Sequence, residues 1–424
     1  MARLGSAAVA LALLGGAVIA APAGAEAVNE ATDPTLLRDV GPLLGLRRHE
    51  SSYSLAVGDY DDDGWTDFLI VHHGSRPSEL FHNDHDGQRS TGVSIVLQLV
   101  DTIHDRPDRH GCVMGDPNLD DLIDLLCTKG AQQGTAKKWN ELWIQGPEGT
   151  WVDRARTWGV EDPWGRGRLP VWIDLNRDRW PDLFLGNDIP RHDQHVTPDR
   201  TYVNDRGRRF DEVDVGLTKQ IGADCAQTAD LNRDGWDDLL LCGEDELFFF
   251  ARDGDRFRAA NEEYGVPTAE TNAARLVDLN GDGREDLVTV GLRSLDVRLA
   301  AADGSFRSPV LTRPLVHGHG VAVGDVDGRR GPDILVVEGC DDRVNVPDVL
   351  LLNGGDATSW MPVDDMPRMP PGELAGCGDT AGTLDFDRDG MDDFVVLNGG
   401  GESQPLDIDG PDQLLTMGNW RPPR

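Results

Sequence analysis

The sequence predicts an all-β fold, because three features recur along its 424 residues. An acidic segment of nine residues is repeated, a short continuous apolar run follows each copy, and a second apolar run then ends in a cluster of Asn, Asp and Gly. Short apolar runs bounded by turn residues are typical of buried strands. Repeats of about 50 residues indicate stacked supersecondary units. We therefore expect a seven-bladed β-propeller of four-stranded antiparallel blades with calcium-binding loops, closed by the N-terminal strand.

The first acidic segment reads GDYDDDGWTD and indicates a metal site, because neighbouring carboxylates repel each other unless a cation lies between them. Counted from its first ligand, Asp59, Asp61 and Asp63 occupy positions one, three and five, and Asp67 occupies position nine. Alternate positions place oxygen atoms on one side of a tight turn, and Gly64 at position six permits a positive φ. All these ligands are hard oxygens, which favour calcium.

The acidic segment occurs seven times, and successive copies begin 57, 58, 56, 48, 47 and 60 residues apart. The later copies begin at Asp116, Asp174, Asp230, Asp278, Asp325 and Asp385. Position twelve, which must chelate in an EF-hand loop, holds Ile70, Cys127, Leu185, Leu241, Thr289, Val336 and Val396. Runs such as DFLIV and DLLLC leave the loops, so each loop is expected to join two strands.

The remaining two strands of each unit come from segments such as ELFHNDHDG and TYVNDRGRRF, in which a third strand, a tight turn and a fourth strand follow one another. The last unit ends at WRPPR, without room for its fourth strand. The segment LLRDVGPLLGL near the amino terminus is similar to the fourth-strand segments WVDRARTWGV and FRAANEEYGV. We expect residues 37–46 to supply the outer strand of blade seven, which leaves no open edge there.

The first residues have the layout of a cleavable secretion signal, with an apolar run and an A-x-A ending at Ala25. We expect a signal peptide over residues 1–25, a short linker over 26–35 and a single propeller over 36–424. An uncleaved membrane anchor is the alternative, because the run is long enough to span a bilayer. An exported protein meets calcium and an oxidising environment, which suits the acidic loops and the six cysteines.

The charge of the chain excludes nucleic acid as a partner. The net charge is −35 and the chain has only four lysines, whereas binding to phosphates needs clustered cations. We expect an extracellular protein that is not inserted in the membrane after signal cleavage.

The repeats resemble FG-GAP or VCBS repeats, which build the integrin α-subunit head and many secreted bacterial propellers. The similarity extends over nearly all of the expected mature chain. It implies a seven-bladed propeller with calcium bound between the first two strands of several blades. Such propellers serve as adhesion heads, as lectins and occasionally as scaffolds of polysaccharide lyases, so the resemblance implies no single activity.

We expect most of the acidic loops to hold calcium with a structural role. Loops one, four, five and seven keep every feature, with ligands Asp59, Asp61, Asp63, Asp67, Asp230, Asn232, Asp234, Asp238, Asp278, Asn280, Asp282, Asp286, Asp385, Asp387, Asp389 and Asp393. Loops two and three keep the ligands Asp116, Asn118, Asp120, Asp124, Asp174, Asn176, Asp178 and Asp182. The alternative is that all seven are metal-free Asx-turns.

Three loops depart from the pattern at position six. Asp121 and Arg179 replace glycine in loops two and three, where a positive φ costs about 1 kcal/mol and is expected to weaken binding. Loop six has Arg329 at position five and Arg330 at position six. A guanidinium cannot ligate calcium, so we expect this site to be empty or poorly occupied, with internal salt bridges to Asp325, Asp327 and Asp333.

The cysteines suggest disulfides within and between blades. Cys112 and Cys127 flank loop two, and Cys225 and Cys242 flank loop four, each pair on the two strands of one hairpin. Cross-strand bridges are expected there, and the remaining pair, Cys340 with Cys377, is placed to join neighbouring blades. Sequence alone leaves fifteen pairings open for six cysteines.

The face opposite the acidic loops is the expected ligand-binding face, because its loops vary most in length. It collects nine of the eleven histidines, at positions His49, His72, His73, His104, His110, His192, His195, His317 and His319. A ligand or transition-metal site near the axis is one interpretation, and unrelated polar surface loops are the favoured one, since no spacing matches a zinc motif. Trp65, Trp180 and Trp236 in the acidic loops suit either stacking on sugars or packing between blades.

Two functions compete on this pattern. The first is a secreted calcium-binding module for a glycan or protein ligand, without catalytic residues. The alternative is a polysaccharide-acting, lyase-like enzyme that uses the histidine-rich face through residues such as His72, His192 and His317. No G-x-S-x-G or H-E-x-x-H motif is present, which disfavours a dedicated hydrolase. A structural role at the cell surface has no supporting motif.

Overall fold

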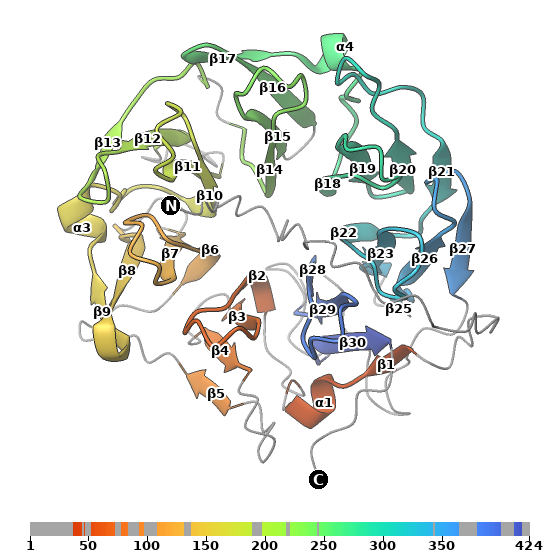
Figure 1. Cartoon of the computed structure of the whole chain (residues 1–424), viewed down its shortest axis with the longest axis horizontal. Coiled ribbons are helices and arrows are strands. Elements are labelled where there is room, and N and C mark those ends of the chain that lie inside the picture. The colour runs from red at the N-terminus through yellow and green to blue at the C-terminus, as the bar shows by residue number, and fades with distance from the viewer. Residues whose placement is uncertain are drawn as a thin grey trace, which may run out of the picture.

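In the computed structural model the described residues form a ring of seven four-stranded antiparallel sheets (Figure 1). The described residues are 37–44, 46, 52–72, 78–83, 93–96, 108–130, 137–188, 197–217, 221–243, 246–341, 344–363, 380–399 and 411–417. The expected signal peptide and linker lie outside them. The predicted all-β, seven-bladed fold is confirmed.

The blades follow one another along the chain, and the sheets of blades one to six keep the sequence order of their strands. Blades one to three contain β2 (Ser52–Gly58), β3 (Asp67–His72), β4 (Glu79–His82), β5 (Val93–Val96), β6 (Arg109–Gly115), β7 (Asp124–Lys129), β8 (Glu141–Gly146), β9 (Thr150–Asp153), β10 (Gly167–Ile173), β11 (Asp182–Asn187), β12 (Arg200–Asn204) and β13 (Phe210–Glu212). Blades four to six contain β14 (Cys225–Ala229), β15 (Asp238–Cys242), β16 (Leu247–Asp253), β17 (Arg256–Ala259), β18 (Ala273–Val277), β19 (Asp286–Val290), β20 (Ser294–Arg298), β21 (Leu311–Pro314), β22 (Gly318–Gly324), β23 (Asp333–Glu338), β26 (Val349–Asn353) and β27 (Trp360–Val363).

Blade seven combines strands from both ends of the sequence. Its strands are β28 (Thr380–Leu384), β29 (Asp393–Leu397), β30 (Gln413–Met417) and β1 (Leu37–Asp39). β1 is the outer strand and pairs antiparallel with β30, with Leu37 opposite Met417. The N-terminal residues therefore lie in the same sheet as residues almost 400 positions later in the chain.

Helices are few and short in the described part of the chain. They are α1 (Gly41–Leu44), η2 (Pro147–Gly149), α3 (Ala155–Trp158) and α4 (Asn261–Tyr264), and a small hairpin of β24 (Cys340–Asp341) and β25 (Val344–Asn345) lies outside the blades. Among these residues, no helix is both long enough and apolar enough to cross a membrane.

The continuous apolar runs become the second strands of the blades. Every residue of β3, β7, β11, β15, β19, β23 and β29 is buried. A strand is covered on both faces only when a neighbouring blade packs on each side, which explains why these segments do not alternate between apolar and polar residues.

The hydrophobic core is divided among the seven junctions between adjacent blades, with one buried cluster at each. At the junction of blades seven and one, Phe68 and Ile70 of β3 pack in the same cluster as Val395 and Leu397 of β29. Phe68 stacks on Phe81 with ring centroids 4.7 Å apart. This junction therefore has a buried apolar core like the other six.

Two predicted disulfides are confirmed. Cys112 is bonded to Cys127 and Cys225 to Cys242, and each pair lies directly opposite across the first two strands of its blade. The third expected pair includes Cys377, which lies outside the described residues.

Candidate metal centres

The seven acidic loops share one backbone conformation, whatever residue they carry at position six. That residue has a positive φ in every loop, at Gly64, Asp121, Arg179, Gly235, Gly283, Arg330 and Gly390. The arginines adopt 70° in loop three and 67° in loop six. The loops without glycine therefore form the same turn, with a non-glycine residue in the strained left-handed conformation.

A second left-handed residue occurs at position four of every loop, which the sequence analysis missed. These residues are Asp62, Leu119, Arg177, Arg233, Gly281, Gly328 and Arg388. Glycine at this position in loops five and six was the available signal. Two left-handed residues on either side of position five curl the loop, so that its backbone N–H groups converge on the position-one carboxylate.

The aspartate at position one is fixed by the loop backbone. Asp59 accepts the N–H groups of Asp63 and Gly64 at 3.1 and 2.8 Å. Asp230 accepts those of Asp234 and Gly235 at 2.9 and 2.8 Å. The first ligand is therefore held in place by residues that also define the turn.

The aspartate at position nine is buried in all seven blades and connects the loop to the third strand. Asp67 accepts the N–H of Tyr60 at position two and the N–H of Asn83 after β4, at 3.1 and 2.7 Å. The exposed fraction does not exceed 2% for any of Asp67, Asp124, Asp182, Asp238, Asp286, Asp333 and Asp393. These residues contribute to the fold as well as to the expected metal sites.

Burial raises the pKa of each position-nine carboxyl, because the charged form loses its hydration. The pKa is about 6 for Asp238, which accepts two backbone N–H groups, and about 8 for Asp124. Asp124 accepts the N–H of Gln145 at 2.8 Å, whereas position two of its loop is Pro117, which has no N–H to donate. Its Oδ2 atom is consequently buried without a hydrogen-bond partner.

The carboxylates of three loops converge closely enough to share a cation. The potential ligand atoms lie within 4.8 Å of one another in the groups Asp59–Asp61–Asp67, Asp325–Asp327–Asp333 and Asp385–Asp387–Asp393. Oδ1 of Asp385 is buried and has no hydrogen-bond partner. A buried unpartnered oxygen within a set of hard oxygen donors fits a calcium ion, so the residues present suit the metal implied by the repeats.

Loops two to five carry asparagine at position three, and in loops two, three and four both ends of its side-chain amide bond within the loop. Nδ2 of Asn118, Asn176 and Asn232 donates to the position-five aspartate at 3.0, 3.1 and 3.0 Å. Oδ1 of each accepts the N–H of that same aspartate. The position-five carboxylates are therefore held next to position three, as the expected ligand set requires.

Loop six keeps its three carboxylates together despite its arginines. The backbone N–H of Arg329 donates to Asp325 and Asp327 at 3.0 and 2.9 Å. Arg330 Nη1 donates to the carbonyl of Gly354 at 3.4 Å. Burial raises the pKa of Asp327 above its ordinary value, and the charges of Arg329 and Arg330 offset only part of this rise. Weak occupancy of this loop remains a prediction.

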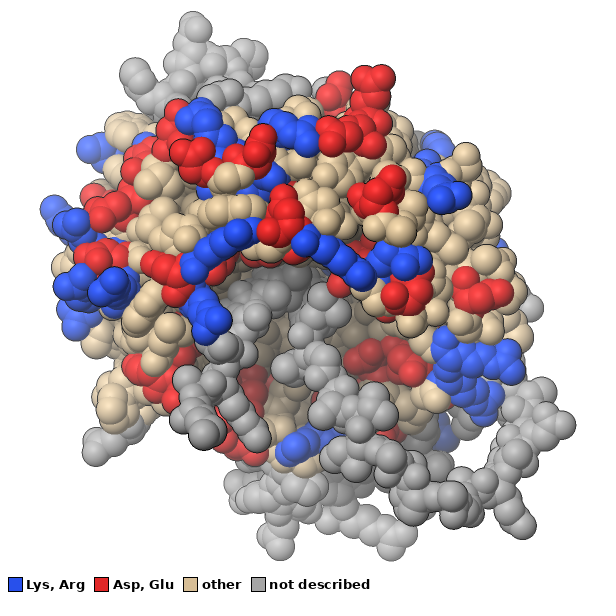
Figure 2. All heavy atoms as spheres, turned by 45° about the horizontal axis from the view of Figure 1, so that its top comes forward, with Lys and Arg blue, Asp and Glu red and all other residues tan. Residues whose placement is uncertain are grey.

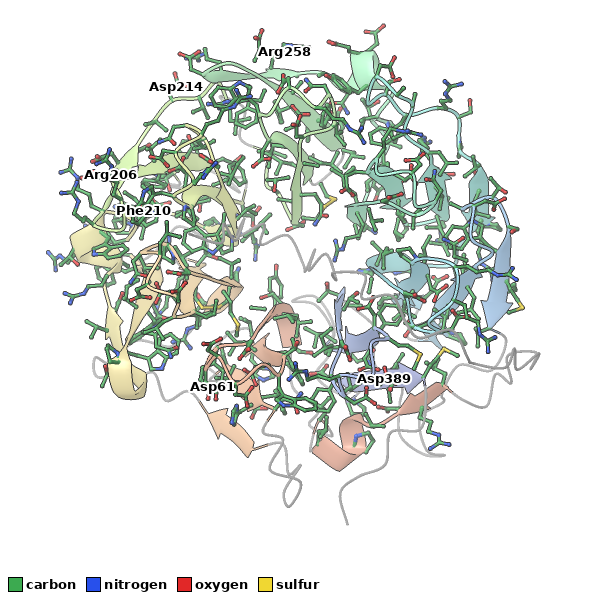
Figure 3. The ribbon with its side chains drawn as sticks, viewed as in Figure 1. Asp61, Arg206, Phe210, Asp214, Arg258 and Asp389 are labelled. Atoms are coloured by element: carbon green, nitrogen blue, oxygen red, sulfur yellow. A yellow bond between two sulfur atoms is a disulfide. The ribbon has the colours of Figure 1, made fainter. Side chains whose placement is uncertain are left out.

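Cationic side chains from one loop cover the tryptophans of the next loop. The Arg177 guanidinium lies 3.8 Å from the centroid of Trp236, and it donates to the carbonyl of Asp234 at 2.6 Å. Arg388 of loop seven lies 5.0 Å from the centroid of Trp65 in loop one. Figure 3 labels Asp61 and Asp389 on these two adjacent loops. The contacts support packing between blades as the role of these tryptophans.

The ends of the inner strands on the opposite face carry a buried polar network. Arg168, at the start of β10, donates to Asp188 at 3.2 and 2.5 Å and to the hydroxyl of Tyr53 at 3.0 Å. Its Nη1 atom is 2.5 Å from Nδ1 of His110, and Arg166 also contacts Asp188, at 2.7 Å. The network joins blades one, two and three.

The remaining described histidines of this face lie in blades six and one. His317 and His319 stack in blade six with ring centroids 4.9 Å apart, and burial together with His317 lowers the pKa of His319 to about 4. His72 lies 3.9 Å from Glu79 in blade one. The other five predicted histidines, His49, His73, His104, His192 and His195, lie outside the described residues.

An exposed tryptophan marks the same face next to the polar network. Trp139 is 46% exposed, and the backbone on either side of it is anchored, because Lys138 and Asn140 donate N–H groups to the carbonyls of Pro163 and Glu161. The Lys137 ammonium lies 5.5 Å from the centroid of the Trp164 ring. The sequence analysis did not single out these residues, since no repeat pattern marks them.

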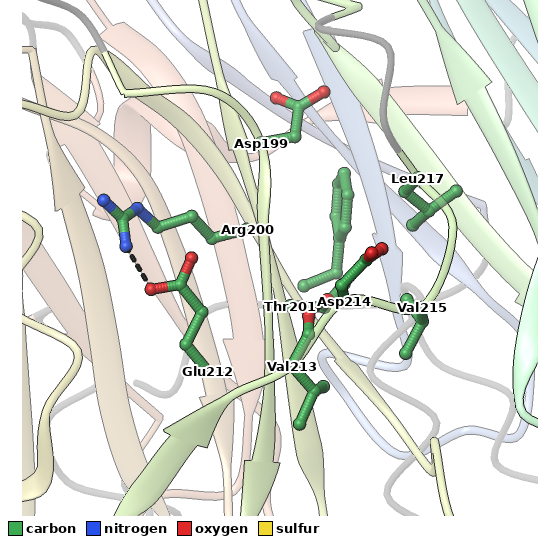
Figure 4. Close-up of a pocket in the computed structure, with 9 residues that line it drawn as sticks. Asp199, Arg200, Thr201, Glu212, Val213, Asp214, Val215 and Leu217 are labelled. Carbon is green, nitrogen blue, oxygen red and sulfur yellow. Dashed lines mark hydrogen bonds and ion pairs between the residues drawn. The ribbon is translucent and has the colours of Figure 1, made fainter.

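A cavity of about 370 Å³ lies at the outer part of blade three, near blade four (Figure 4). Its walls include Asp199, Arg200 and Glu212, and the latter two form an ion pair. Burial raises the pKa of Asp199 to about 6, while N–H groups of Asn187 and Ile221 donate to it. The buried carboxyl accepts backbone N–H groups, and Nε of Arg200, which is buried without a hydrogen-bond partner, lies 3.4 Å from Oδ1 of Asp162. Both charged groups therefore interact within the protein.

Acidic and basic side chains are interspersed over the surface of the ring. Figure 2 shows Lys and Arg alternating with Asp and Glu along the edge of the central hollow. The net charge of −35 is thus not presented as one uninterrupted acidic field on this side.

Comparison with known proteins supports the repeat assignment. The family model described as "FG-GAP-like repeat" matches residues 230–289 and 278–336, which include loops four, five and six. No curated protein sequence matches the chain significantly.

Several solved structures are similar to the chain at low sequence identity. BBS1N in its complex with ARL6DN is 11% identical, with a TM-score of 0.51 over 92% of this chain and 99% of that chain. A lectin from Agrocybe aegerita, described as recognising non-reducing terminal N-acetylglucosamine, is 16% identical, with a TM-score of 0.49 over 74% of this chain and 80% of that chain. A protein from Lactobacillus plantarum is 12% identical, with a TM-score of 0.45 over 74% and 84%. At these identities the likeness concerns the fold alone.

Proposed function

The chain is a seven-bladed propeller that contains FG-GAP-like repeats, and we propose that it is a secreted, calcium-stabilised module that binds a glycan or a protein ligand. Calcium has a structural role in this proposal. The residues that would hold it are those at positions one, three, five and nine of the acidic loops. The ion supplies positive charge that offsets the repulsion between their carboxylates.

The observation that carries the calcium proposal is the unpartnered oxygen at position one of loop seven. Oδ1 of Asp385 is buried without a hydrogen-bond partner and belongs to a group of three carboxylates within 4.8 Å. A buried acceptor left unpaired costs about 1–3 kcal/mol, and more when it is charged. A bound cation removes that cost and stabilises only the folded state.

The ligand is proposed to bind on the face opposite the acidic loops, around Trp139. An aromatic ring with 46% of its surface exposed offers an apolar face to a sugar ring or to an apolar side chain of a protein. The backbone around it is fixed by hydrogen bonds to Pro163 and Glu161, so the ring is presented by an ordered segment. By contrast, Arg177 and Arg388 already cover the loop tryptophans Trp236 and Trp65.

Two measurements test the two parts of this proposal separately. Elemental analysis of the purified chain after dialysis against calcium is expected to find several calcium ions per chain, and a calcium-free protein contradicts the structural role. A glycan array and a pull-down in calcium are expected to identify a ligand, and Trp139→Ala is expected to lose it. Met361→Ala is the control, because Met361 is exposed to a similar extent, 49%, on blade six. Uniform blanks with the unmodified chain contradict the binding role.

Secretion is part of the proposal and has its own support and test. The two cross-strand disulfides suit an oxidising compartment. Expression of the full sequence followed by N-terminal sequencing of protein from the medium is expected to give a chain that begins at Glu26. Retention in the membrane fraction would support the uncleaved anchor instead.

A lyase-like enzyme remains the second candidate, favoured by the His317–His319 pair. Because the pKa of His319 is lowered to about 4, its imidazole is neutral at pH 7 but a weak proton acceptor, so His317 is the candidate base of the pair. A screen of polysaccharides for unsaturated products tests this function. Turnover that is unchanged in a His317→Ala, His319→Ala variant would exclude the pair as its catalytic base.

A further inference from the structure

Blade one differs from the other blades at the residue that lies across from its position-nine aspartate. Phe68 pairs with Phe81, so the next residue of β4, His82, lies opposite Asp67. The same register places Ile144, Val203, Ala251, Leu299, Leu352 and Thr416 at this place in blades two to seven. Among the residues that the structure describes, the first acidic loop alone therefore has an imidazole opposite its position-nine aspartate.

The imidazole of His82 points into the carboxylate group. Nδ1 lies 3.5 Å from Oδ2 of Asp61 and 3.4 Å from Oδ1 of Asp67. His82, Asp61 and Asp63 also form a group whose potential ligand atoms all lie within 4.8 Å of one another. An edge contact with Tyr60, with ring centroids 5.6 Å apart, holds the ring on its other side.

The nitrogen lies at ion-pair distance from the two carboxylates but makes no hydrogen bond. Nδ1 of His82 is buried from solvent and has no hydrogen-bond partner, although the whole side chain is 18% exposed. A buried ring nitrogen without a partner is costly, and an electron-pair acceptor among the three side chains removes that cost. A metal ion is such an acceptor.

The donor set distinguishes between metals. Calcium takes six to eight oxygen ligands, whereas imidazole suits zinc and its neighbours among the first-row transition metals. Zinc binds imidazole nitrogen and carboxylate oxygen at about 2.0–2.2 Å, which separates tetrahedral ligands by about 3.4 Å. The two measured separations from Nδ1, 3.4 and 3.5 Å, agree with that spacing.

We propose that the first acidic loop binds a zinc-type divalent transition metal through Nδ1 of His82 and the carboxylates of Asp61 and Asp67, in preference to calcium. The inference deepens the proposed function, since it rests on this loop being a cation site, but it does not require the other loops to hold calcium. A ring of oxygen-only sites would then contain one site of different metal selectivity, next to the junction with blade seven.

Metal counting on the full chain tests the proposal. The protein is stripped with a chelator, desalted and equilibrated by dialysis with zinc alone or with calcium alone, and bound metal is measured by elemental analysis. His82→Leu reproduces the side chain that blade five has at Leu299. We expect the unmodified chain to hold one zinc more than this variant, and the two proteins to hold equal calcium. Zinc bound at other histidines is the same in both proteins, so it cancels when the zinc content of the variant is subtracted from that of the unmodified chain.

A reciprocal variant keeps the test decisive. Leu299→His places an imidazole opposite Asp286 in blade five and is expected to add one zinc. Cobalt bound to the unmodified chain is expected to show a visible absorption band that His82→Leu reduces. Should His82→Leu fold poorly by circular dichroism, His82→Gln is the replacement, with zinc affinity expected to fall by about tenfold or more.

Some outcomes overturn the inference without affecting the proposed function. Equal zinc content and affinity in the unmodified chain and the His82 variants would show that the imidazole is only an ion-pair partner of Asp61 and Asp67. Displacement of the extra zinc by equimolar calcium would refute the stated preference. Loss of calcium binding throughout, with the zinc difference intact, would instead contradict the calcium proposal alone.

Discussion

Asp412 gives the sharpest prediction about stability, because it is a buried carboxyl at the junction of blades seven and one and no acidic loop contains it. Its Oδ1 accepts the hydroxyl of Ser52 and the N–H of Asn398, both at 2.7 Å. Its pKa is raised from 3.8 to about 7, mainly because burial disfavours the charged form. The two hydrogen bonds and His72 offset part of this rise, whereas the charge of Glu79 adds to it. Asp412→Asn is expected to keep both hydrogen bonds, because an amide oxygen accepts them equally.

The direction of the pH effect follows from the raised pKa. Below about pH 4 the carboxyl is protonated in both the folded and the unfolded chain, so its stabilising contribution is fully present. As the pH rises from about 4 to about 7, the unfolded chain releases the proton while the folded chain retains it, and this contribution is lost. A pKa difference of about three units corresponds to a loss on the order of 4 kcal/mol.

The assay is urea unfolding of both proteins in calcium at several pH values between 4.5 and 8. Titration of the acidic loops is common to both proteins and cancels in the difference between their unfolding free energies. Relative to the parent, Asp412→Asn is expected to gain stability steadily up to about pH 7 and to remain level above it. The exposed Asp356→Asn is the control, with no such trend. A difference that does not vary with pH would refute the reasoning, because it would mean that Asp412 ionises as readily in the folded chain as in the unfolded one.

Four further changes have expected outcomes. Removing divalent metals with a chelator is expected to lower the melting temperature, and re-addition of calcium to restore it, because an ion that binds only the folded state stabilises it; an unchanged melting curve would contradict this. Phe394→Ala, at a fully buried residue of the blade six and seven junction, is expected to reduce the unfolding free energy by about 3–5 kcal/mol in urea, compared with little change for the exposed Val310→Ala. Arg179→Gly removes a side chain at a φ of 70° and is expected to stabilise loop three by about 1 kcal/mol and to tighten its calcium binding in calorimetry. Removing the Cys225–Cys242 bridge by a double change to Ala is expected to cost about 2–4 kcal/mol, and equal urea midpoints would exclude a stabilising role.

The blades could be predicted from sequence because each one carries the same local signals. The apolar run after each acidic loop indicated a strand covered on both faces, and all seven such strands are fully buried. Cys225 and Cys242 could be paired because they lie at similar distances from one turn, which in a hairpin places them opposite each other. These inferences need only local sequence and strand periodicity.

Contacts between repeats could not be predicted in the same way. Arg177 is 57 residues away from Asp234, whose carbonyl accepts a hydrogen bond from it. No sequence pattern indicates that the side chain of this position-four residue reaches the next acidic loop. Pro117 was visible in the sequence, but its consequence for Asp124 depends on a hydrogen bond that only the folded loop reveals. The sequence did not indicate His82 as a ligand for a similar reason, since its place beside Asp61 and Asp67 depends on the register of β4 against β3.

The acidic loops therefore have two tasks, metal binding and strand connection, and the position-nine aspartate takes part in both. In blade four, Asp238 of the second strand accepts N–H groups from Leu231 in the loop and from Arg252 in the third strand, so it joins the loop to two strands even without a metal. The same burial raises its pKa to about 6, which makes the charged form less stable than in water. A cation at the exposed side of the loop would favour the charged form and with it these hydrogen bonds, because charge-assisted bonds are stronger than neutral ones. Metal binding and strand connection are then coupled through one carboxylate in each blade, so that losing the ions is expected to loosen the third strands as well as the loops.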